Sequence, residues 1–124
     1  RIASQVFGGE DVVTQAIRIK RLHPADRGKM KEIDLLAVSR RTVLVCEAKS
    51  KPTVEKVREF QASLEDFQEF FPEYNGLAIV PMMASIAFDP SLVRFMTGQR
   101  MLALGFGDET MEILNPEADV RPGA

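Results

Sequence analysis

Residues 32–50 read EIDLLAVSRRTVLVCEAKS, and this stretch decides the fold. Two mostly apolar runs, residues 33–38 and residues 42–48, flank a short polar segment, a pattern that predicts a β-hairpin. Val45 and Cys46 point to opposite sides of the second strand, so we expect that strand to be buried on both faces. A strand of this kind belongs in the middle of a sheet that helices cover.

The turn of this hairpin determines which residues face each other. A two-residue turn centred between Arg40 and Arg41 aligns Asp34 with Glu47 on one face, with Cβ atoms about 5 Å apart. Glu47 and Lys49 are two residues apart on their strand and therefore share that face. An odd-length loop would send the two carboxylates to opposite faces unless a bulge intervened. Arg-Arg is not a favoured two-residue turn, so this register is a specific prediction.

An edge strand and a loop are predicted before the hairpin. Residues 12–22 alternate, so Ile17 and Ile19 are expected on a buried face and Arg18 on an exposed one. Residues 23–29 contain turn-forming Pro and Gly and predict a loop.

One long helix is predicted after the hairpin. Thr53 is suited to its N-cap, an apolar stripe at steps of three and four predicts its buried face, and Pro72 and Gly76 end it. The stripe consists of Val57, Phe60, Leu64, Phe67 and Phe71. Beyond it we expect a strand, a helix and two strands, over residues 77–80, 90–98, 101–106 and 111–114. Residues 115–124 are expected to form a flexible tail.

Strands interleaved with helices predict the α/β class, with helices flanking a central mixed β-sheet. The 124 residues indicate a single domain, and the longest apolar stretch, residues 77–88, is interrupted by Pro81 and shorter than a membrane span. Because residue 1 is Arg rather than Met, we expect a fragment of a longer chain. We expect no association with membranes.

Cysteine and histidine usage excludes several classes of site. Cys46 is the single cysteine, so it cannot form an internal disulfide, and its apolar neighbours indicate a buried thiol in a reducing, cytoplasmic setting. No Cys/His spacing suits zinc. A nucleophilic triad based on histidine has one candidate base, His23, which lies in the predicted loop.

The charge is distributed unevenly along the chain. Residues 1–60 carry 13 Lys and Arg against 8 Asp and Glu, a net +5, whereas residues 61–124 carry 3 against 10, a net −7. A bipolar domain of this kind can offer a basic face to phosphates although its net charge is −2. Ordinary solvation of exposed faces explains the same pattern equally well.

The chemistry-bearing residues are the two aligned carboxylates and the neighbouring lysine. Carboxylates side by side near a buried strand repel each other and lose hydration, and a hard divalent cation such as Mg²⁺ or Mn²⁺ relieves both costs. A cation there can activate water and polarise a phosphoryl oxygen, while the Lys49 ammonium offsets developing charge. The alternative is that Glu47 and Lys49 mark the point where the strand reaches solvent, with Asp34 in an ordinary ion pair.

Asp34 followed about a dozen residues later by Glu47-Ala48-Lys49, on a hairpin ahead of a capped helix, resembles the PD-(D/E)XK, or restriction endonuclease-like, superfamily. The resemblance covers residues 10–106 and is closest to small versions of the domain found in bacterial proteins, often attached to a helical region. It implies a core in the order helix, three strands, helix, strand. It also implies Mg²⁺ or Mn²⁺ bound by Asp34, Glu47 and the carbonyl of Ala48, with Lys49 assisting phosphodiester hydrolysis.

The resemblance also points to auxiliary residues. Members commonly have an acidic residue on a helix before the first strand, and Glu10 is the nearest counterpart, although the chain begins too late for most of that helix. Some members carry a glutamine on the helix after the lysine, and Gln61 lies near that place; a solvent-facing helical glutamine is the simpler interpretation. Glu32 shares the face of Asp34 by alternation but lies one step beyond it.

Basic residues near the predicted site are candidate phosphate contacts. We expect this role for Lys29, Lys31 and Lys51, which flank the Asp34 and Lys49 end of the hairpin. For the remaining basic residues of the first half, edge protection and ordinary surface charge are the preferred interpretation.

The sequence therefore predicts a metal-dependent nuclease domain acting on DNA through a metal-activated water. The rival hypothesis keeps the fold without the activity, as a catalytically silent module for nucleic-acid binding or protein assembly. In that case a homodimer would form through the Phe-rich helix or the strand after Gly76, and an upstream helical region of the same longer protein would be a second partner.

Overall fold

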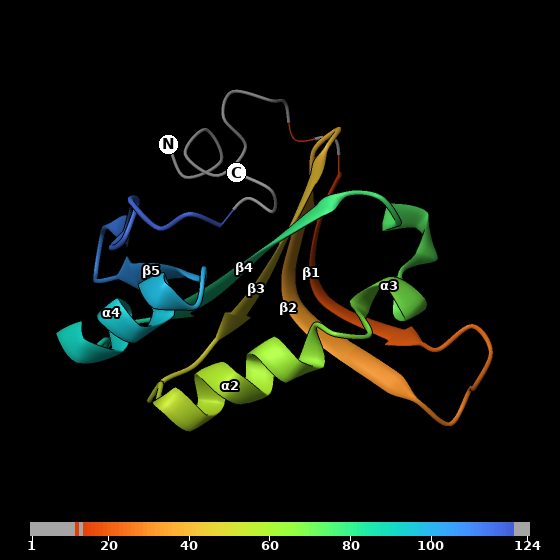
Figure 1. The fold of residues 1–124 in the computed structure, drawn as a ribbon, viewed down its shortest axis with the longest axis horizontal. Coiled ribbons are helices and arrows are strands. Elements are labelled where there is room, and N and C mark those ends of the chain that lie inside the picture. The colour runs from red at the N-terminus through yellow and green to blue at the C-terminus, as the bar shows by residue number, and fades with distance from the viewer. Residues whose placement is uncertain (1–11, 13, 121–124) are drawn as a thin grey trace.

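The computed structural model describes residue 12 and residues 14–120 (Figure 1). In this range the chain forms a six-stranded sheet in the order β1-β2-β3-β4-β5-β6, with three α-helices. The elements are β1 (Thr14–Leu22), β2 (Met30–Val38), β3 (Thr42–Ala48), α2 (Val54–Ser63), α3 (Phe67–Phe70), a 3₁₀ turn (Pro72–Tyr74), β4 (Ala78–Ser85), α4 (Pro90–Gly98), β5 (Leu102–Phe106) and β6 (Met111–Ile113).

The sheet is mixed. The pairs β1–β2, β2–β3 and β5–β6 are antiparallel, and the pairs β3–β4 and β4–β5 are parallel. The predicted α/β class with a mixed central sheet is therefore confirmed. None of the helices in the described part of the chain has both the length and the apolar character needed to cross a bilayer.

The three described helices pack on one face of the sheet (Figure 1). Their apolar side chains join those of the strands in one buried group, the helix-side cluster, which consists of Ile33, Leu36, Val38, Val43, Val45, Val57, Phe60, Phe67, Phe70, Phe71, Met83, Leu92, Met96, Met101 and Ala103. Burying a side chain of this size stabilises the fold by about 1.5–3 kcal/mol. The apolar stripe predicted after the hairpin supplies the largest of these side chains.

The opposite face of the sheet carries a second buried group, the far-side cluster. It consists of Ala37, Leu44, Cys46, Val80, Met82, Ala84, Leu102, Leu104 and Ile113. Val12, Ala118 and Val120 pack against it. Because Val45 and Cys46 belong to different clusters and are both buried, the prediction that β3 is covered on both faces is confirmed.

The hairpin register agrees with the sequence prediction. Leu35 pairs with Cys46 and Val38 pairs with Val43, which centres the turn between Arg40 and Arg41. Neither arginine adopts positive φ. Instead the buried Ser39 stabilises the turn, because its N–H donates to the Thr42 carbonyl at 2.8 Å and its Oγ accepts from the Thr42 N–H at 3.2 Å. A serine side chain thus replaces the glycine chemistry that favoured hairpin turns use.

Strand β1 departs from the predicted alternation. Ile17 is 70% exposed, so the prediction that it lies on a buried face with Ile19 was wrong. The cause is Arg18, which has φ +52° and is left out of the pairing between β1 and β2. A left-handed residue reverses the alternation at that point, so only Ile19 packs against the helix-side cluster. This conformation costs about 1–2 kcal/mol for a residue other than glycine.

The predicted long helix is broken. Helix α2 ends at Ser63 and α3 begins at Phe67, although the whole stripe faces the core. The break coincides with contacts from β2, because the Lys31 ammonium binds the Ser63 carbonyl and the Asp66 carboxylate at 2.8 Å. A carbonyl bonded to Lys31 favours termination of the helix at this point. The predicted N-cap is confirmed, since Thr53 Oγ1 accepts from the Lys56 N–H at 3.1 Å.

Strand β4 is longer than predicted and continues through Pro81 to Ser85. Proline has no N–H to donate and is rarely tolerated in a central strand. Here β5 begins to pair with β4 only at Met82, so the missing donor of Pro81 lies just before that ladder. The strand can therefore pass through the proline without losing a hydrogen bond to β5.

The segment expected to be a flexible tail begins with a buried anchor. Asn115 is 0% exposed, and its Oδ1 accepts from the Ala103 N–H at 2.8 Å. Its Nδ2 donates to the Met101 carbonyl and to Thr97 Oγ1, both at 3.0 Å. The side chain therefore ties the end of β6 to β5 and α4, and the prediction of a tail from residue 115 was wrong at this position.

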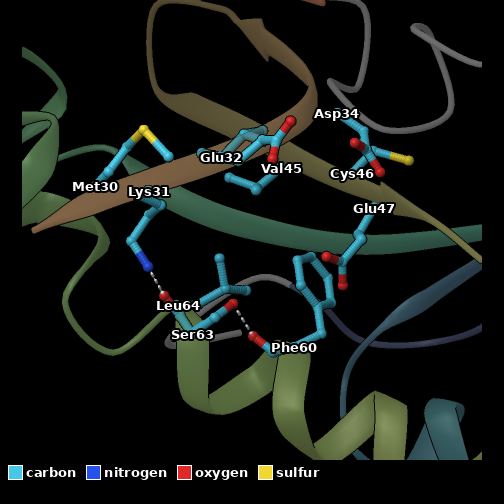
Figure 2. Close-up of a pocket in the computed structure, with 11 residues that line it drawn as sticks. Met30, Lys31, Glu32, Asp34, Val45, Cys46, Glu47, Phe60, Ser63 and Leu64 are labelled. Carbon is cyan, nitrogen blue, oxygen red and sulfur yellow. Dashed lines mark hydrogen bonds between the residues drawn. The ribbon is translucent and has the colours of Figure 1, made fainter. Parts of the chain in front are cut away.

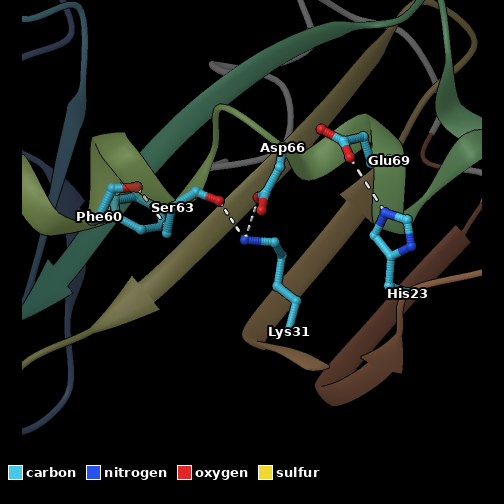
Figure 3. A network of polar contacts seen from close by, with 6 residues as sticks. All are labelled: His23, Lys31, Phe60, Ser63, Asp66 and Glu69. Carbon is cyan, nitrogen blue, oxygen red and sulfur yellow. Dashed lines mark hydrogen bonds and ion pairs between the residues drawn. The ribbon is translucent and has the colours of Figure 1, made fainter. Parts of the chain in front are cut away.

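Ion pairs and a histidine contact join the β1–β2 hairpin to α3 and the segments that flank it. Arg21 forms an ion pair with Glu73 at 2.8 Å, and His23 Nε2 lies 3.3 Å from Glu69 Oε1. Lys31 forms the third link, to Asp66 (Figure 3). Basic residues of the first half of the chain are thus partly neutralised by acidic residues of the second half. The expected basic face is smaller than the sequence count suggested.

Candidate functional site

Asp34 lies where β2 and β3 separate. Their pairing extends to Leu35 and Cys46, and beyond it the Asp34 Oδ2 accepts the Ala48 N–H at 2.9 Å. In a regular antiparallel ladder that N–H would donate to a main-chain carbonyl. The side-chain alternation of β2 also breaks here, since Ile33 belongs to the helix-side cluster and Leu35 packs against the far-side cluster. The irregular strand holds the carboxylate beside the end of β3.

Glu47 follows Val45 on the helix-facing side of β3. Its side chain is 32% exposed and extends toward α2, with its carboxylate beside the Phe60 ring (Figure 2). Burial raises the pKa of Glu47 above its ordinary value, the Lys49 charge lowers it, and the Asp34 charge raises it again. The charges of Lys49 and Asp34 therefore act on Glu47 in opposite directions.

Lys49 completes the group. Its Nζ lies 3.9 Å from Glu47 Oε1, and its side chain is 35% exposed. The main chain at this position is fixed by β4, because the Lys49 N–H donates to the Ala84 carbonyl at 2.9 Å. The structure thus places Lys49 against Glu47, and it places Asp34 on the main chain of Ala48 between them, although the β2–β3 pairing stops at Leu35 and Cys46.

Glu59 is a charged neighbour that the sequence reasoning did not identify. It lies on α2, it is exposed, and its charge also raises the pKa of Glu47. No sequence pattern distinguished it from Glu55 or Glu65 on the same predicted helix. Its relevance depends on how α2 packs over β3.

The predicted auxiliary residues have different environments. Glu32 is exposed and lines the same pocket as Asp34 and Glu47. Gln61 donates from Nε2 to Gln99 Oε1 at 3.1 Å, which directs its side chain to the end of α4. Glu10 lies outside the residues that the structure describes.

The three predicted phosphate contacts also differ. Lys29 and Lys51 are exposed, as that role requires. Lys31 is half-buried, with its ammonium 2.8 Å from Asp66 Oδ1 and 5.1 Å from the centre of the Phe70 ring. Its positive charge is already neutralised by Asp66, so we assign Lys31 a structural role instead of a phosphate contact.

The site offers some of the oxygen ligands that a hard cation such as Mg²⁺ needs. Asp34 and Glu47 supply carboxylate oxygens, the ligands that Mg²⁺ and Mn²⁺ prefer. Within the described residues, no group of three His, Cys, Asp or Glu side chains is arranged to hold a metal ion. The two carboxylates are therefore an incomplete set of ligands, and a cation bound here would keep much of its hydration shell.

Replacing Glu47 with glutamine is expected to stabilise the metal-free protein by up to about 1 kcal/mol at pH 7, a small value because solvent screens the partly exposed group. The raised pKa of Glu47 means that its ionised form is disfavoured in the folded state. The gain should disappear below about pH 4, where the unfolded chain also carries protonated glutamate. Urea denaturation in chelator at both pH values measures it, and a less stable variant at pH 7 would contradict the assignment.

Cys46 is expected to react slowly with thiol reagents in the folded protein. Burial, together with the charges of Asp34 and Glu47, raises the pKa of its thiol to about 12. At pH 8 the native thiol is protonated and inaccessible, whereas the unfolded thiol is partly ionised. Labelling with Ellman's reagent with and without guanidinium tests this, and rapid labelling of the native protein would show that the end of β3 opens.

Comparison of the chain with protein-family models, curated proteins and solved structures finds no match. The resemblance to the PD-(D/E)XK superfamily therefore rests on the hairpin residues. The arrangement of Asp34, Glu47 and Lys49 given above is the basis for interpreting the site.

Proposed function

We propose that this chain is a metal-dependent nuclease domain that hydrolyses phosphodiester bonds of DNA, with a restriction endonuclease-like core. The observation that carries the proposal is the placement of three side chains. Asp34 is anchored on the Ala48 N–H, Glu47 is half-buried and lines the same pocket as Asp34, and the Lys49 ammonium lies 3.9 Å from Glu47. Two interacting carboxylates in a partly desolvated place are unfavourable without a cation.

Each residue has a separate role in the proposal. Asp34 and Glu47, with the carbonyl of Ala48, hold Mg²⁺ or Mn²⁺. The bound ion supplies Lewis-acid chemistry, activating water and polarising the phosphate. Lys49 orients the attacking water and offsets negative charge that develops on the phosphate. Lys29 and Lys51, both exposed, bind flanking phosphates.

The second candidate function is a catalytically silent module that binds nucleic acid or assembles with protein, including a second copy of the chain. The ion pairs of Arg21 and Lys31 favour it, because they remove basic charge that a nuclease would use to hold DNA. The crowded carboxylates favour the enzyme, since a module without catalysis gains nothing from their repulsion.

Nicking of supercoiled plasmid in Mg²⁺ or Mn²⁺ tests the enzyme. We expect nicking that chelator stops and that Glu47→Ala reduces by at least about 100-fold, as loss of a key electrostatic contact does. Calorimetric titration with Mn²⁺ separates the two candidates, because binding should be lost in Asp34→Ala. Nicking unchanged by Glu47→Ala would exclude the site, and absence of Asp34-dependent Mn²⁺ binding would favour the silent module.

A further inference from the structure

A pocket of about 230 Å³ extends from the two carboxylates along the space between β2 and α2 (Figure 2). Asp34 and Glu47 lie at one end of it, and Met30 and Leu64 lie at the other. Between them Phe60 projects from α2 toward the strands. The pocket therefore combines apolar walls with an acidic end, immediately beside the place where a scissile phosphate would bind.

The width of this pocket is fixed by cross-links between its walls. The Lys31 ammonium, on β2, binds the Ser63 carbonyl at the end of α2 and the Asp66 carboxylate at 2.8 Å. Ser63 Oγ in turn donates to the Phe60 carbonyl at 2.6 Å. The two contacts of Lys31 tie β2 to the end of α2 and to the segment after it, so this end of the pocket is built into the fold.

The size and chemistry of the pocket select its occupant. A cavity of about 150 Å³ accepts a benzene ring, so this one accepts a somewhat larger flat ring. The Glu32 carboxylate, which takes no part in the proposed metal site, disfavours a phosphate group inside the pocket. A neutral aromatic ring with an amino group, as adenine, guanine and cytosine have, can contact the apolar walls and donate to the Glu32 carboxylate. A base inside a duplex cannot enter the pocket, because stacked neighbours cover its faces and its pairing partner occupies its edge.

We infer that the pocket takes the unpaired base of a nucleotide next to the scissile phosphate, so that the substrate is single-stranded DNA. This inference rests on the proposed nuclease function, because it takes the position of the phosphate from the two carboxylates. The Met30 side chain, 56% exposed at the far end, is flexible enough to cover bases of different size.

Binding measured in Ca²⁺, which occupies oxygen sites without supporting rapid cleavage, tests the pocket directly. The probes are a fluorescent single-stranded oligonucleotide and its blunt duplex, followed by anisotropy. Ser63→Trp places an indole at the exposed rim of the pocket, whereas Ala62→Trp places one on the neighbouring exposed position of α2, outside the pocket. Ser63→Ala removes the hydroxyl bond and leaves the pocket open.

We expect the wild type to bind the single strand at least about tenfold more tightly than the duplex, within the range that one stacked base supplies. Ser63→Trp should remove this preference, and Ala62→Trp and Ser63→Ala should keep it. Equal binding of both probes, or a preference that survives Ser63→Trp, would overturn the inference.

Cleavage of the same oligonucleotides in Mn²⁺ separates this inference from the proposed function. Cleavage of both forms at equal rates, unaffected by Ser63→Trp, would leave a nuclease without a base pocket. Single-strand binding that depends on the pocket, without any cleavage, would support base binding in the pocket and exclude the proposed nuclease activity.

Discussion

Replacing Lys49 with alanine is expected to slow plasmid nicking by at least about 100-fold while Mn²⁺ affinity stays the same or rises slightly. The Lys49 ammonium lies 3.9 Å from Glu47 Oε1, close enough to act at the site without being a metal ligand. Its removal takes away a positive charge that competes with the cation for the carboxylates. Nicking assays and calorimetry on the same variant measure the two effects separately.

Glu47→Ala is the variant to compare with Lys49→Ala, because it should lose both nicking and metal binding, whereas Lys49→Ala should lose nicking alone. Lys20→Ala, which removes a lysine from the exposed surface of β1, is the matched control and should behave like the wild type. If Lys49→Ala retains full nicking, the lysine has no catalytic role. If it loses Mn²⁺ binding, its role is to support the site structurally.

Asn115→Ala is expected to lower the free energy of unfolding by about 3 kcal/mol, the largest stability effect that we predict for a single polar side chain. The substitution leaves the Ala103 N–H and the Met101 carbonyl without the amide that they now contact, in residues that are 0% exposed. An unsatisfied buried polar group costs about 1–3 kcal/mol, and two are created here. The bond to Thr97 on α4 is lost as well.

Urea denaturation of Asn115→Ala beside Glu117→Ala measures this effect, since Glu117 is exposed two residues further along the same segment. The control should remain within about 0.5 kcal/mol of the wild type. A loss below about 1 kcal/mol in Asn115→Ala would mean that water replaces the amide, and that residues after β6 do not anchor the sheet.

Most of the candidate site could be derived from local rules. Side chains alternate along a strand, so Glu47 and Lys49 had to share a face. A two-residue turn then predicted Asp34 opposite Glu47. The observed pairing has this register as far as Leu35 and Cys46 and stops there, so the pair of carboxylates itself stays a prediction. What the rules missed is the bond from the Ala48 N–H to Asp34, because it forms only where the two strands separate.

The basic residues show the limit of counting charges. The sequence gives no means of telling Lys29 from Lys31. Lys29 is exposed, whereas Lys31 forms an ion pair with Asp66, which lies beyond the end of α2. By sequence, the two lysines are equally good candidates for phosphate contacts. Only the packing of α2 and α3 on the β1–β2 hairpin distinguishes them. Partners 35 residues apart in the chain leave no local pattern.

The sequence alone determined the strand hairpin, its register, the cap of α2 and the apolar stripe. Each depends on residues within a few positions of one another, where backbone geometry and side-chain periodicity act directly. Tertiary structure alone decided that the stripe is divided between α2 and α3, that Arg18 reverses the alternation of β1, and that Asn115 is buried. Those outcomes depend on hydrogen bonds and burial between distant segments, whose free energies exceed the local preferences that they override.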